Sequence, residues 1–266
     1  MAKIRLIGKI VTDVVTGTVG QNSKFAKYLV EVAIATQGSS NPRLAQNSDI
    51  KKSYFAVMAF GKQAEIALAK GTTVELDGSV EIAKFQLSTS APAKDAALVQ
   101  PEHTTILQGN VVHYAKAYNV LGNFVKDNAD VYVPQNGGKT VYNQKIATTK
   151  IIKEQEYVSF FGIRLFGDRG DKLYAKDLLS KNKVKSVVID GSITATYTKK
   201  EANGETKEYF NCDINVNDFQ IASWKKEKNE SSNNQRNATN SGTYNEPPIE
   251  YYAAHSEEIN EDEIPF

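Results

Sequence analysis

The chain has 266 residues, 41% of them hydrophobic, which is enough for two ordinary domains with packed cores. Its single cysteine, Cys212, excludes an intramolecular disulfide and a cysteine-rich zinc site, and it is typical of a reducing compartment. The net charge of +1 hides an asymmetry, because residues 225–266 carry net −5 and the preceding residues carry +6. A basic body with an acidic tail favours a nucleic-acid-binding protein, although modest charge of either sign is common on surfaces.

The N-terminus shows no targeting pattern. Residues 1–7 alternate charged and apolar side chains and lack the continuous apolar run of a signal peptide. No segment approaches the roughly 18 to 20 apolar residues that span a bilayer. We therefore expect a soluble, cytoplasmic, nucleoid-associated protein with no membrane partner.

An internal repeat organises the chain up to Trp224. Four segments recur in the same order: 6–11 as 120–125, 34–36 as 146–148, 53–61 as 159–167, and 74–80 as 187–193. The second copy holds about seven extra residues, which fall in its helical segment. We interpret the pattern as a tandem duplication and place the two domains at residues 1–115 and 116–224.

Each copy is rich in short β-branched and aromatic runs and contains one helical stretch between its third and fourth strands. The helices are expected at residues 62–70, with Gly71 as the stop, and roughly at residues 168–180. A helix at that place in a five-stranded barrel is the OB-fold order. The sequence therefore predicts a mainly all-β chain of two tandem OB-fold barrels with one helix each. Asp77-Gly78 and Asp190-Gly191 are interpreted as turns.

Composition changes abruptly after Trp224. Residues 225–256 are polar and nearly free of apolar side chains up to Asn245, which predicts a disordered linker. Residues 257–266 form an acidic tip that ends in Ile264, Pro265 and Phe266. Acidic runs often serve only to solubilise a protein, but solubilisation does not require an apolar ending. We interpret the tip as a docking segment for other proteins.

Period-two alternation divides the third strand of each copy into two faces. The inner faces are expected to be Phe55, Val57 and Ala59 in the first copy, and Phe161, Ile163 and Leu165 in the second. The outer faces are then Tyr54, Ala56, Met58 and Phe60, and Phe160, Arg164 and Phe166. An outward face that is aromatic and basic suits the stacking of nucleic-acid bases. The alternative is that these aromatics pack against a neighbouring subunit or a covering loop.

Aromatic and basic side chains also occur together on the hairpin between the fourth and fifth strands of each copy. Lys84 and Phe85 stand there in the first copy, and Tyr197, Lys199 and Lys200 in the second. A solvated hairpin tip is the alternative reading.

The candidate enzyme motifs in the sequence lack residues that catalysis or metal binding requires. Gly137-Gly138-Lys139-Thr140 ends like a phosphate-binding loop, but the position of the required earlier glycine is Val133, and strand-like sequence follows it. The three histidines are scattered, without partners at zinc-ligand spacing. We expect no catalytic residue, no metal and no cofactor.

The sequence resembles the bacterial single-stranded-DNA-binding (SSB) proteins over nearly its whole length. The most specific match is the end, where Asn245-Glu246-Pro247-Pro248 is followed by Glu261, Asp262, Glu263, Ile264, Pro265 and Phe266. Residues 60–65 and 70–78 are also similar to the family's strand-helix-strand core. The resemblance implies sequence-nonspecific binding of single-stranded DNA in replication, recombination and repair, with partner proteins recruited by the tip.

The resemblance also implies site residues. Tyr54, Phe60 and Phe85 match aromatic stacking positions of the family, and Phe160 and Phe166 match two of them in the second copy. With the basic and hairpin residues, the expected DNA-binding set is Tyr54, Phe60, Lys62, Lys84, Phe85, Phe160, Arg164, Phe166 and Tyr197. Thr198 stands where the first copy has Phe85, and neither copy has an aromatic after its Ala-Thr pair, so the copies are expected to bind unequally.

Most members of this family have one OB domain and form tetramers, whereas a minority have two domains and form dimers. The chain resembles the minority type, which implies a homodimer. Two rival functions remain: a nuclease or another DNA-modifying enzyme built on OB domains, which lacks support from any metal or acid-base constellation, and an RNA-binding OB protein.

Overall fold

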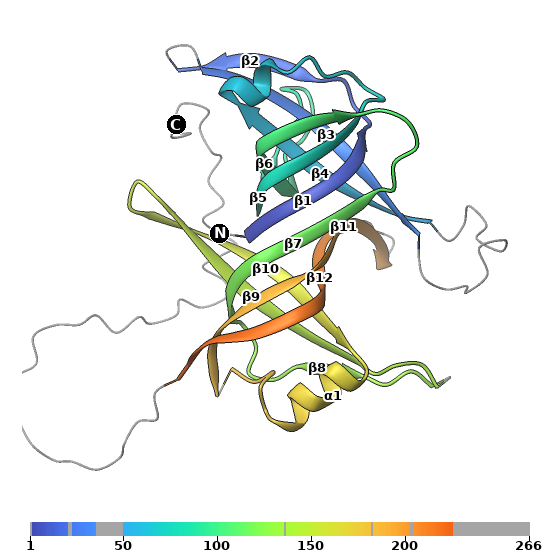
Figure 1. Cartoon of the computed structure of the whole chain (residues 1–266), viewed down its shortest axis with the longest axis vertical. Coiled ribbons are helices and arrows are strands. Elements are labelled where there is room, and N and C mark those ends of the chain that lie inside the picture. Colours follow the sequence, from blue (N-terminus) through green and yellow to red (C-terminus); the bar gives the residue numbers. More distant parts are fainter. Residues whose placement is uncertain are drawn as a thin grey trace, which may run out of the picture.

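The computed structural model describes residues 2–20, 23–35, 50–135, 137–181, 183–202 and 205–225, which form two β-barrels stacked along the long axis (Figure 1). The strands of the first barrel are β1 (Ala2–Ile10), β2 (Val15–Val19), β3 (Ser23–Ala35), β4 (Ile50–Phe60), β5 (Thr73–Phe85) and β6 (Lys94–Leu107). Those of the second are β7 (Tyr114–Phe124), β8 (Asp130–Tyr132), β9 (Val141–Ile152), β10 (Gln155–Phe166), β11 (Val184–Ala202) and β12 (Glu205–Trp224).

Strand pairing closes the two barrels in the same order. The first runs β1–β3–β4–β6–β5 and back to β1, and the second runs β7–β9–β10–β12–β11 and back to β7. Only the β4–β6 and β10–β12 pairs are parallel among these contacts. This is the five-stranded OB-fold order, so the predicted pair of tandem OB barrels is confirmed.

Alternation along β4 and β10 fills the barrels as predicted. Every side chain assigned to an inner face is fully buried, namely Phe55, Val57, Ala59, Phe161, Ile163 and Leu165. They pack with apolar residues from the other strands into one continuous core. The hydrophobic effect therefore fixes which side chains of these strands remain outside.

Gly8 and Gly122 mark equivalent points in the two barrels. A Cβ on Gly8 would lie 2.6 Å from the carbonyl oxygen of Glu31, and a Cβ on Gly122 would lie 3.2 Å from that of Ala147. Because they lack a side chain, the two glycines allow a close approach of neighbouring strands. In the first barrel β1 crosses β3 closely, and in the second barrel β7 crosses β9 closely. This supports the sequence match of residues 6–11 with 120–125.

The match of residues 34–36 with 146–148 is wrong by four positions. Val30 pairs with Phe55 across β3 and β4, and Ile146 pairs with Phe161 across β9 and β10. Val30 therefore occupies the place of Ile146. A short Ile-Ala-Thr motif carries no register of its own, because register is set by which side chains face the core.

Asp77-Gly78 and Asp190-Gly191 are bulges within long strands, and their interpretation as turns was wrong. The pairing of β5 with β6 shifts between Asp77 and Gly78, and that of β11 with its neighbours shifts after Asp190. A Cβ on either glycine would overlap a carbonyl oxygen of the next strand. The glycine thus permits the sharp bend that a small barrel needs.

The helical segments are shorter than predicted. The first is a single 3-10 turn, η2 (Gly61–Glu65), after which Ile66 returns to an extended conformation. The second is α1 (Asp168–Ala175), and its end is closed by hydrogen bonds from the Asp177 and Leu178 N–H groups to the carbonyls of Tyr174 and Leu173. Asp177 has φ +54°, a left-handed conformation that ends a helix.

The two barrels share one sheet, because β1 pairs antiparallel with β7 (Figure 1). Ile4 faces Ala117, and Arg5 faces Lys116. Since β1 and β7 are the first strands of their barrels, this pairing relates the barrels by an approximate twofold axis. Asn119 is an extra residue in β7 with φ +52°, and its N–H donates to Asp190 Oδ1 at 2.6 Å.

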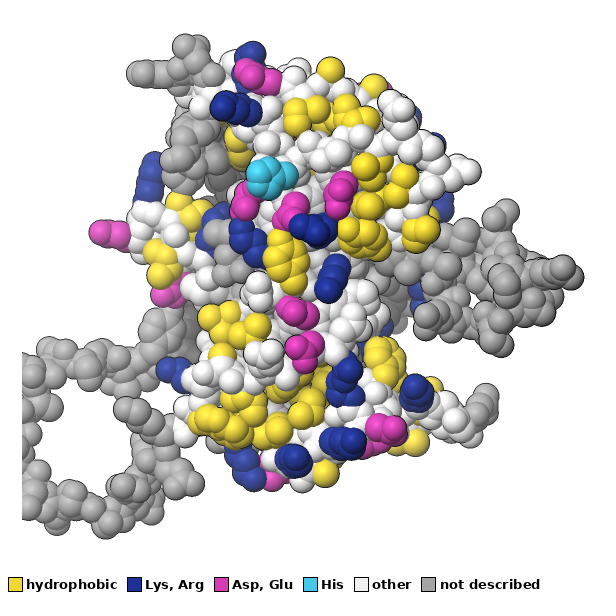
Figure 2. Space-filling model, viewed as in Figure 1, with side chains coloured by type: hydrophobic (Ala, Val, Ile, Leu, Met, Phe, Trp, Pro, Cys, Tyr) yellow, Lys and Arg dark blue, Asp and Glu magenta, His cyan; other side chains and the backbone are white. Residues whose placement is uncertain are grey.

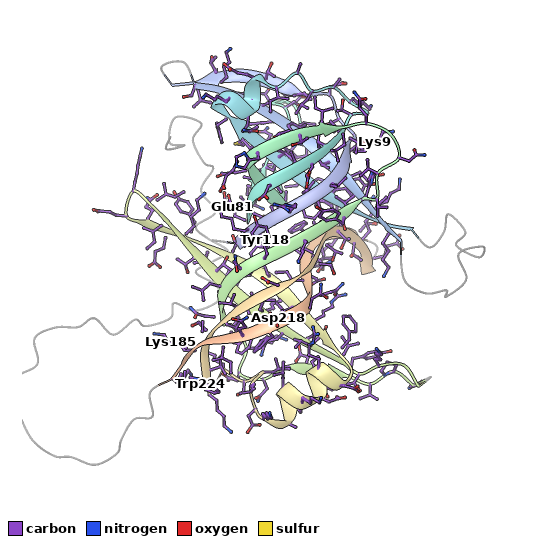
Figure 3. The ribbon with its side chains drawn as sticks, viewed as in Figure 1. Lys9, Glu81, Tyr118, Lys185, Asp218 and Trp224 are labelled. Carbon is purple, nitrogen blue, oxygen red and sulfur yellow. The ribbon has the colours of Figure 1, made fainter. Side chains whose placement is uncertain are left out.

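Charged and polar side chains line this seam, where blue and magenta side chains interleave (Figure 2), and two of their contacts join the barrels. Within the first barrel, Arg5 Nε donates to Asp77 Oδ2 at 2.9 Å. Tyr118 of the second barrel, labelled in Figure 3, donates from Oη to Asp77 Oδ1 at 2.6 Å. These bonds, led by that from Tyr118, lower the pKa of Asp77. At the far end of β5, Lys150 Nζ lies 3.2 Å from Glu81.

No helix in the described part of the chain is long and apolar enough to cross a membrane.

Candidate nucleic-acid interface

The outer face of β3 and β4 carries the aromatic row expected on the first barrel, together with two residues that the sequence analysis missed. Phe25 pairs directly with Phe60, and Lys27 pairs with Met58, so these side chains share one face. All four side chains are partly exposed. The alternation of Phe25, Lys27 and Leu29 along β3 is the signal that could have identified this second strand of the face.

Gly17 of β2 leaves space for the Phe25 ring. Gly17 pairs with Phe25, and a Cβ at this glycine would lie 2.6 Å from two ring atoms. The ring therefore extends across β2. Lys27 Nζ lies 5.3 Å from the centre of the same ring, within cation–π range. An aromatic surface and a cation are thus combined in two neighbouring residues.

Tyr54 lies at the other end of the outer row. It pairs with Glu31 across the strands, and its Oη donates to Glu31 Oε2 at 3.0 Å. Glu31 also forms a 3.2 Å ion pair with Lys52. Burial, followed by the bond to Glu31, raises the pKa of Tyr54. The phenol is therefore anchored while its ring remains partly exposed.

Phe85 is 7% exposed and does not present a free ring face. It packs outside the barrel core in a small apolar cluster with Ala56, Ala96 and Leu98. Leu29 and Met58 pack against this cluster. Phe85 is therefore not at a solvated hairpin tip, which was the alternative reading from the sequence, and its stacking on a base stays a prediction.

A groove of about 250 Å³ brings three predicted residues together at the junction of the barrels. Tyr54 and Phe85 come from the first barrel, and Tyr197 comes from the β11–β12 hairpin of the second. The remaining lining is mostly apolar: Leu29, Ala56, Leu87, Ala91, Pro92, Lys94 and Ala96. Residues that are distant in sequence thus form one aromatic-walled depression.

The hairpin is held in place by contacts between the barrels. Tyr197 Oη donates to the backbone carbonyl of Asp95 at 2.6 Å, and its ring lies 5.2 Å from that of Phe210. Lys94 forms a 2.5 Å ion pair with Glu208, and its Nζ lies 6.0 Å from the centre of the Tyr197 ring. Burial raises the pKa of Tyr197, and the hydrogen bond from Lys94 lowers that of Glu208. Tyr197 is therefore a wall of the groove and not a free hairpin tip.

The two predicted lysines of the first barrel are exposed at different places. Lys84 lies at the end of β5 and forms a 3.1 Å ion pair with Asp95, beside the groove. Lys62 lies in η2, directly after Phe60. Lys62 thus follows an aromatic of the outer row, and Lys84 lies next to the groove.

The outer face of the second barrel contains Phe160, Arg164 and Phe166 on β10, as predicted. Phe166 is 43% exposed and pairs with Val141, which in turn pairs with Tyr132 of β8. Tyr132, which the sequence analysis missed, is 60% exposed. The second aromatic of this row thus stands on the edge strand, whereas in the first barrel it stands on the middle strand.

A second groove, of about 200 Å³, lies beside this row. Its lining is mostly polar and charged: Lys126, Asp130, Asn143, Gln144, Lys145, Gly162, Ile163, Arg164 and Asp213. Arg164 forms an ion pair with Asp213 of β12. This groove lacks the apolar surface of the first one.

The described residues contain no group of three or more His, Cys, Asp and Glu side chains that could hold a metal ion. His113 Nδ1 accepts a hydrogen bond from the Ala33 N–H at 3.4 Å, and Cys212 is buried, which raises the pKa of its thiol. The predicted linker beyond Lys225 and the tip residues Glu261 to Phe266 lie outside the described residues.

Comparison with known proteins identifies the first barrel. Residues 1–107 match the model of the "Single-strand binding protein family". The first barrel is a domain of this family. None of the curated proteins matches the chain.

The whole two-barrel body of the chain is similar to a solved structure. It resembles the single-stranded DNA binding protein from Thermus aquaticus, with 15% identity, a TM-score of 0.55, and coverage of 91% of this chain and 97% of that one. A deletion mutant of the same protein gives the same identity and TM-score, with 86% and 98% coverage. These similarities show the shared fold of two OB barrels in one chain.

Proposed function

We propose that this chain, whose first barrel matches the SSB family, binds single-stranded DNA without sequence preference. One observation carries the proposal: the outer face of the family domain combines a row of aromatic side chains with cations. The Phe25–Phe60 pair and Tyr54 form the row, and Lys27 lies beside it. Every base has a π-face and every nucleotide a phosphate, so such a surface tolerates any sequence.

The two grooves extend this surface over both barrels. The first offers aromatic walls at Tyr54 and Tyr197, and the second offers the cations Lys145 and Arg164. A strand that passes from one groove to the other stacks bases mainly on the first barrel and contacts phosphates on both. The domains 1–115 and 116–224 are thus both part of the binding surface.

The tail supplies a separate activity in this proposal. Residues 225–256 act as a linker, and the acidic tip offers carboxylates to a basic rim and Phe266 to an apolar pocket on a partner. The partners are proteins of DNA replication, recombination and repair, and the setting is the nucleoid of the cytoplasm. The basis is the sequence Glu-Asp-Glu-Ile-Pro-Phe itself.

We further propose a homodimer, which assembles four OB barrels from two chains. The antiparallel pairing of β1 and β7 supports it, since each chain already contains two barrels in an approximately twofold arrangement. Light scattering that gives a monomer or a tetramer mass would refute the dimer.

Competition experiments test the function. A fluorescent dT oligomer is bound first, and unlabelled poly-dT, poly-U and duplex DNA are then added. We expect poly-dT to displace it at the lowest concentration, while displacement by poly-U first would favour an RNA-binding protein. Incubation of labelled single strands with Mg²⁺ should leave them intact, and cleavage would favour the nuclease.

A further inference from the structure

The two barrels differ at one structurally equivalent point of the outer face. On the first barrel, Ala56 of β4 lies beside Leu98 of β6 in the parallel register. On the second, Gly162 of β10 lies beside Asp213 of β12 in the same register. An apolar pair on one barrel thus corresponds to a glycine and a carboxylate on the other.

Gly162 allows the carboxylate to lie across β10. A Cβ at residue 162 would overlap Asp213 Oδ1, so the acid occupies the space that a side chain would fill. In this position Asp213 accepts a hydrogen bond from Arg164 Nη2. Gly162 does not have a positive φ, so its backbone conformation does not require a glycine. The physical reason for a glycine here is the space that the Asp213 side chain needs.

The ion pair is open to solvent on the side of the arginine. The Arg164 side chain is 45% exposed, whereas that of Asp213 is 19% exposed. Lys145 and Lys126 line the same groove. A phosphate that approaches Arg164 here meets a carboxylate of its own sign and must compete with it for the guanidinium.

We propose that Asp213 attenuates the binding of single-stranded DNA by the second barrel, by occupying Arg164 and repelling phosphate. This inference rests on the proposed function. It makes the first barrel the primary site and the second barrel a site that fills after it. Asp213 thereby sets the order in which the two barrels engage a strand.

The test compares Asp213→Asn with Asp177→Asn, which removes the same charge from an exposed ion pair with Lys183 elsewhere on the second barrel. Binding of labelled dT oligomers of increasing length is titrated in the full chain. For long oligomers we expect about fivefold tighter binding by Asp213→Asn than by Asp177→Asn, the effect of one unit charge about 4 Å away in water. The slope of log affinity against log salt should also steepen by about 0.7, because one more phosphate is neutralised.

Two further variants separate attenuation from a structural effect. Gly162→Ala keeps the charge but displaces Asp213 from Arg164, so it should give part of the gain of Asp213→Asn. In an Arg164→Gln background, the gain from Asp213→Asn should shrink, because only the repulsion of phosphate by Asp213 is then relieved. Equal affinities and salt slopes for Asp213→Asn and Asp177→Asn, with wild-type binding intact, would overturn the inference. Failure of the wild-type chain to bind single strands would instead refute the proposed function.

Discussion

At the scale of single residues, alternation along a strand predicted the inner faces correctly because burial leaves no choice of side. Phe55 and Phe161 are both fully buried. Outer faces are harder to predict, because a second layer of packing can cover them. Phe85 illustrates this, because it lies outside the barrel core but packs with Ala56 and Ala96 in a separate apolar cluster.

Replacing Tyr54 and Phe60 together with alanine should weaken binding of single-stranded DNA without unfolding the chain. Both rings lie on the outer face, and loss of each stacked base costs about 1–3 kcal/mol. The measurement is a fluorescence titration with a dT oligomer. Tyr174→Ala, on the exposed surface of α1, is the control, and a double variant with the affinity of this control would mean that the stacking surface is misplaced.

Phe25 should matter as much as Phe60, although it was not apparent from the sequence motifs. Its ring lies over Gly17 and beside Lys27, so Phe25→Ala removes a stacking surface of the same kind. We expect a loss of about 1–3 kcal/mol in binding free energy, measured with the same oligomer. Normal affinity for Phe25→Ala would remove β3 from the interface.

At the scale of secondary structure elements, the OB order was predictable from the helical stretch between the third and fourth strands of each repeat. The bulges within the strands and the lengths of the helices were not predictable. Asp77-Gly78 reads as a turn by composition, but its glycine serves a bend inside a long strand. The helix after β4 is a single 3-10 turn, although Ala64 and Leu68 do face the core. Local composition indicates where a strand or helix is interrupted, but tertiary contacts decide whether the interruption is a turn, a bulge or a 3-10 helix.

The β11–β12 hairpin allows the two roles of Tyr197 to be separated. Tyr197→Phe removes the hydrogen bond to the Asp95 carbonyl but keeps the ring, so it should lower stability by about 1 kcal/mol and leave DNA affinity nearly unchanged. Tyr197→Ala should also weaken binding. Urea unfolding and oligomer titration measure the two effects. If both variants bind equally, the ring has no part in the groove.

At the scale of the whole molecule, the seam between the barrels should depend on pH. The pKa of Asp77 is lowered, so its stabilising contribution is present above the unfolded value of about 4 and is lost as the pH falls through the folded value. The bond to Asp77 raises the pKa of Tyr118 to about 12. This contribution is present below about pH 10, the unfolded value, and is lost as the pH rises toward 12.

Tyr118→Phe should therefore destabilise the chain by about 1 kcal/mol at pH 7, and by less at a pH below the lowered pKa of Asp77, where the carboxylate is protonated. Urea unfolding at the two pH values measures this difference. Tyr174→Phe, which removes the hydroxyl of an exposed tyrosine on α1, is the matched control. A loss that is equal at both pH values would contradict the assignment of Tyr118 to Asp77.

Removing residues 257–266 should separate the two proposed activities of the chain. The tip is acidic, so its deletion should preserve or raise affinity for single strands, while capture of partner proteins on an affinity resin should be abolished. A deleted chain that has lost its affinity for DNA would assign the tip to the binding surface instead.

The most direct test of the central claim is a titration of the full chain with fluorescent dT oligomers of increasing length at two salt concentrations. We predict saturable binding that tightens as the oligomer spans both barrels, falls with added salt, and is matched by mixed-sequence strands of equal length. Absence of binding, or binding that does not change with salt, would contradict an aromatic and basic surface for single-stranded DNA.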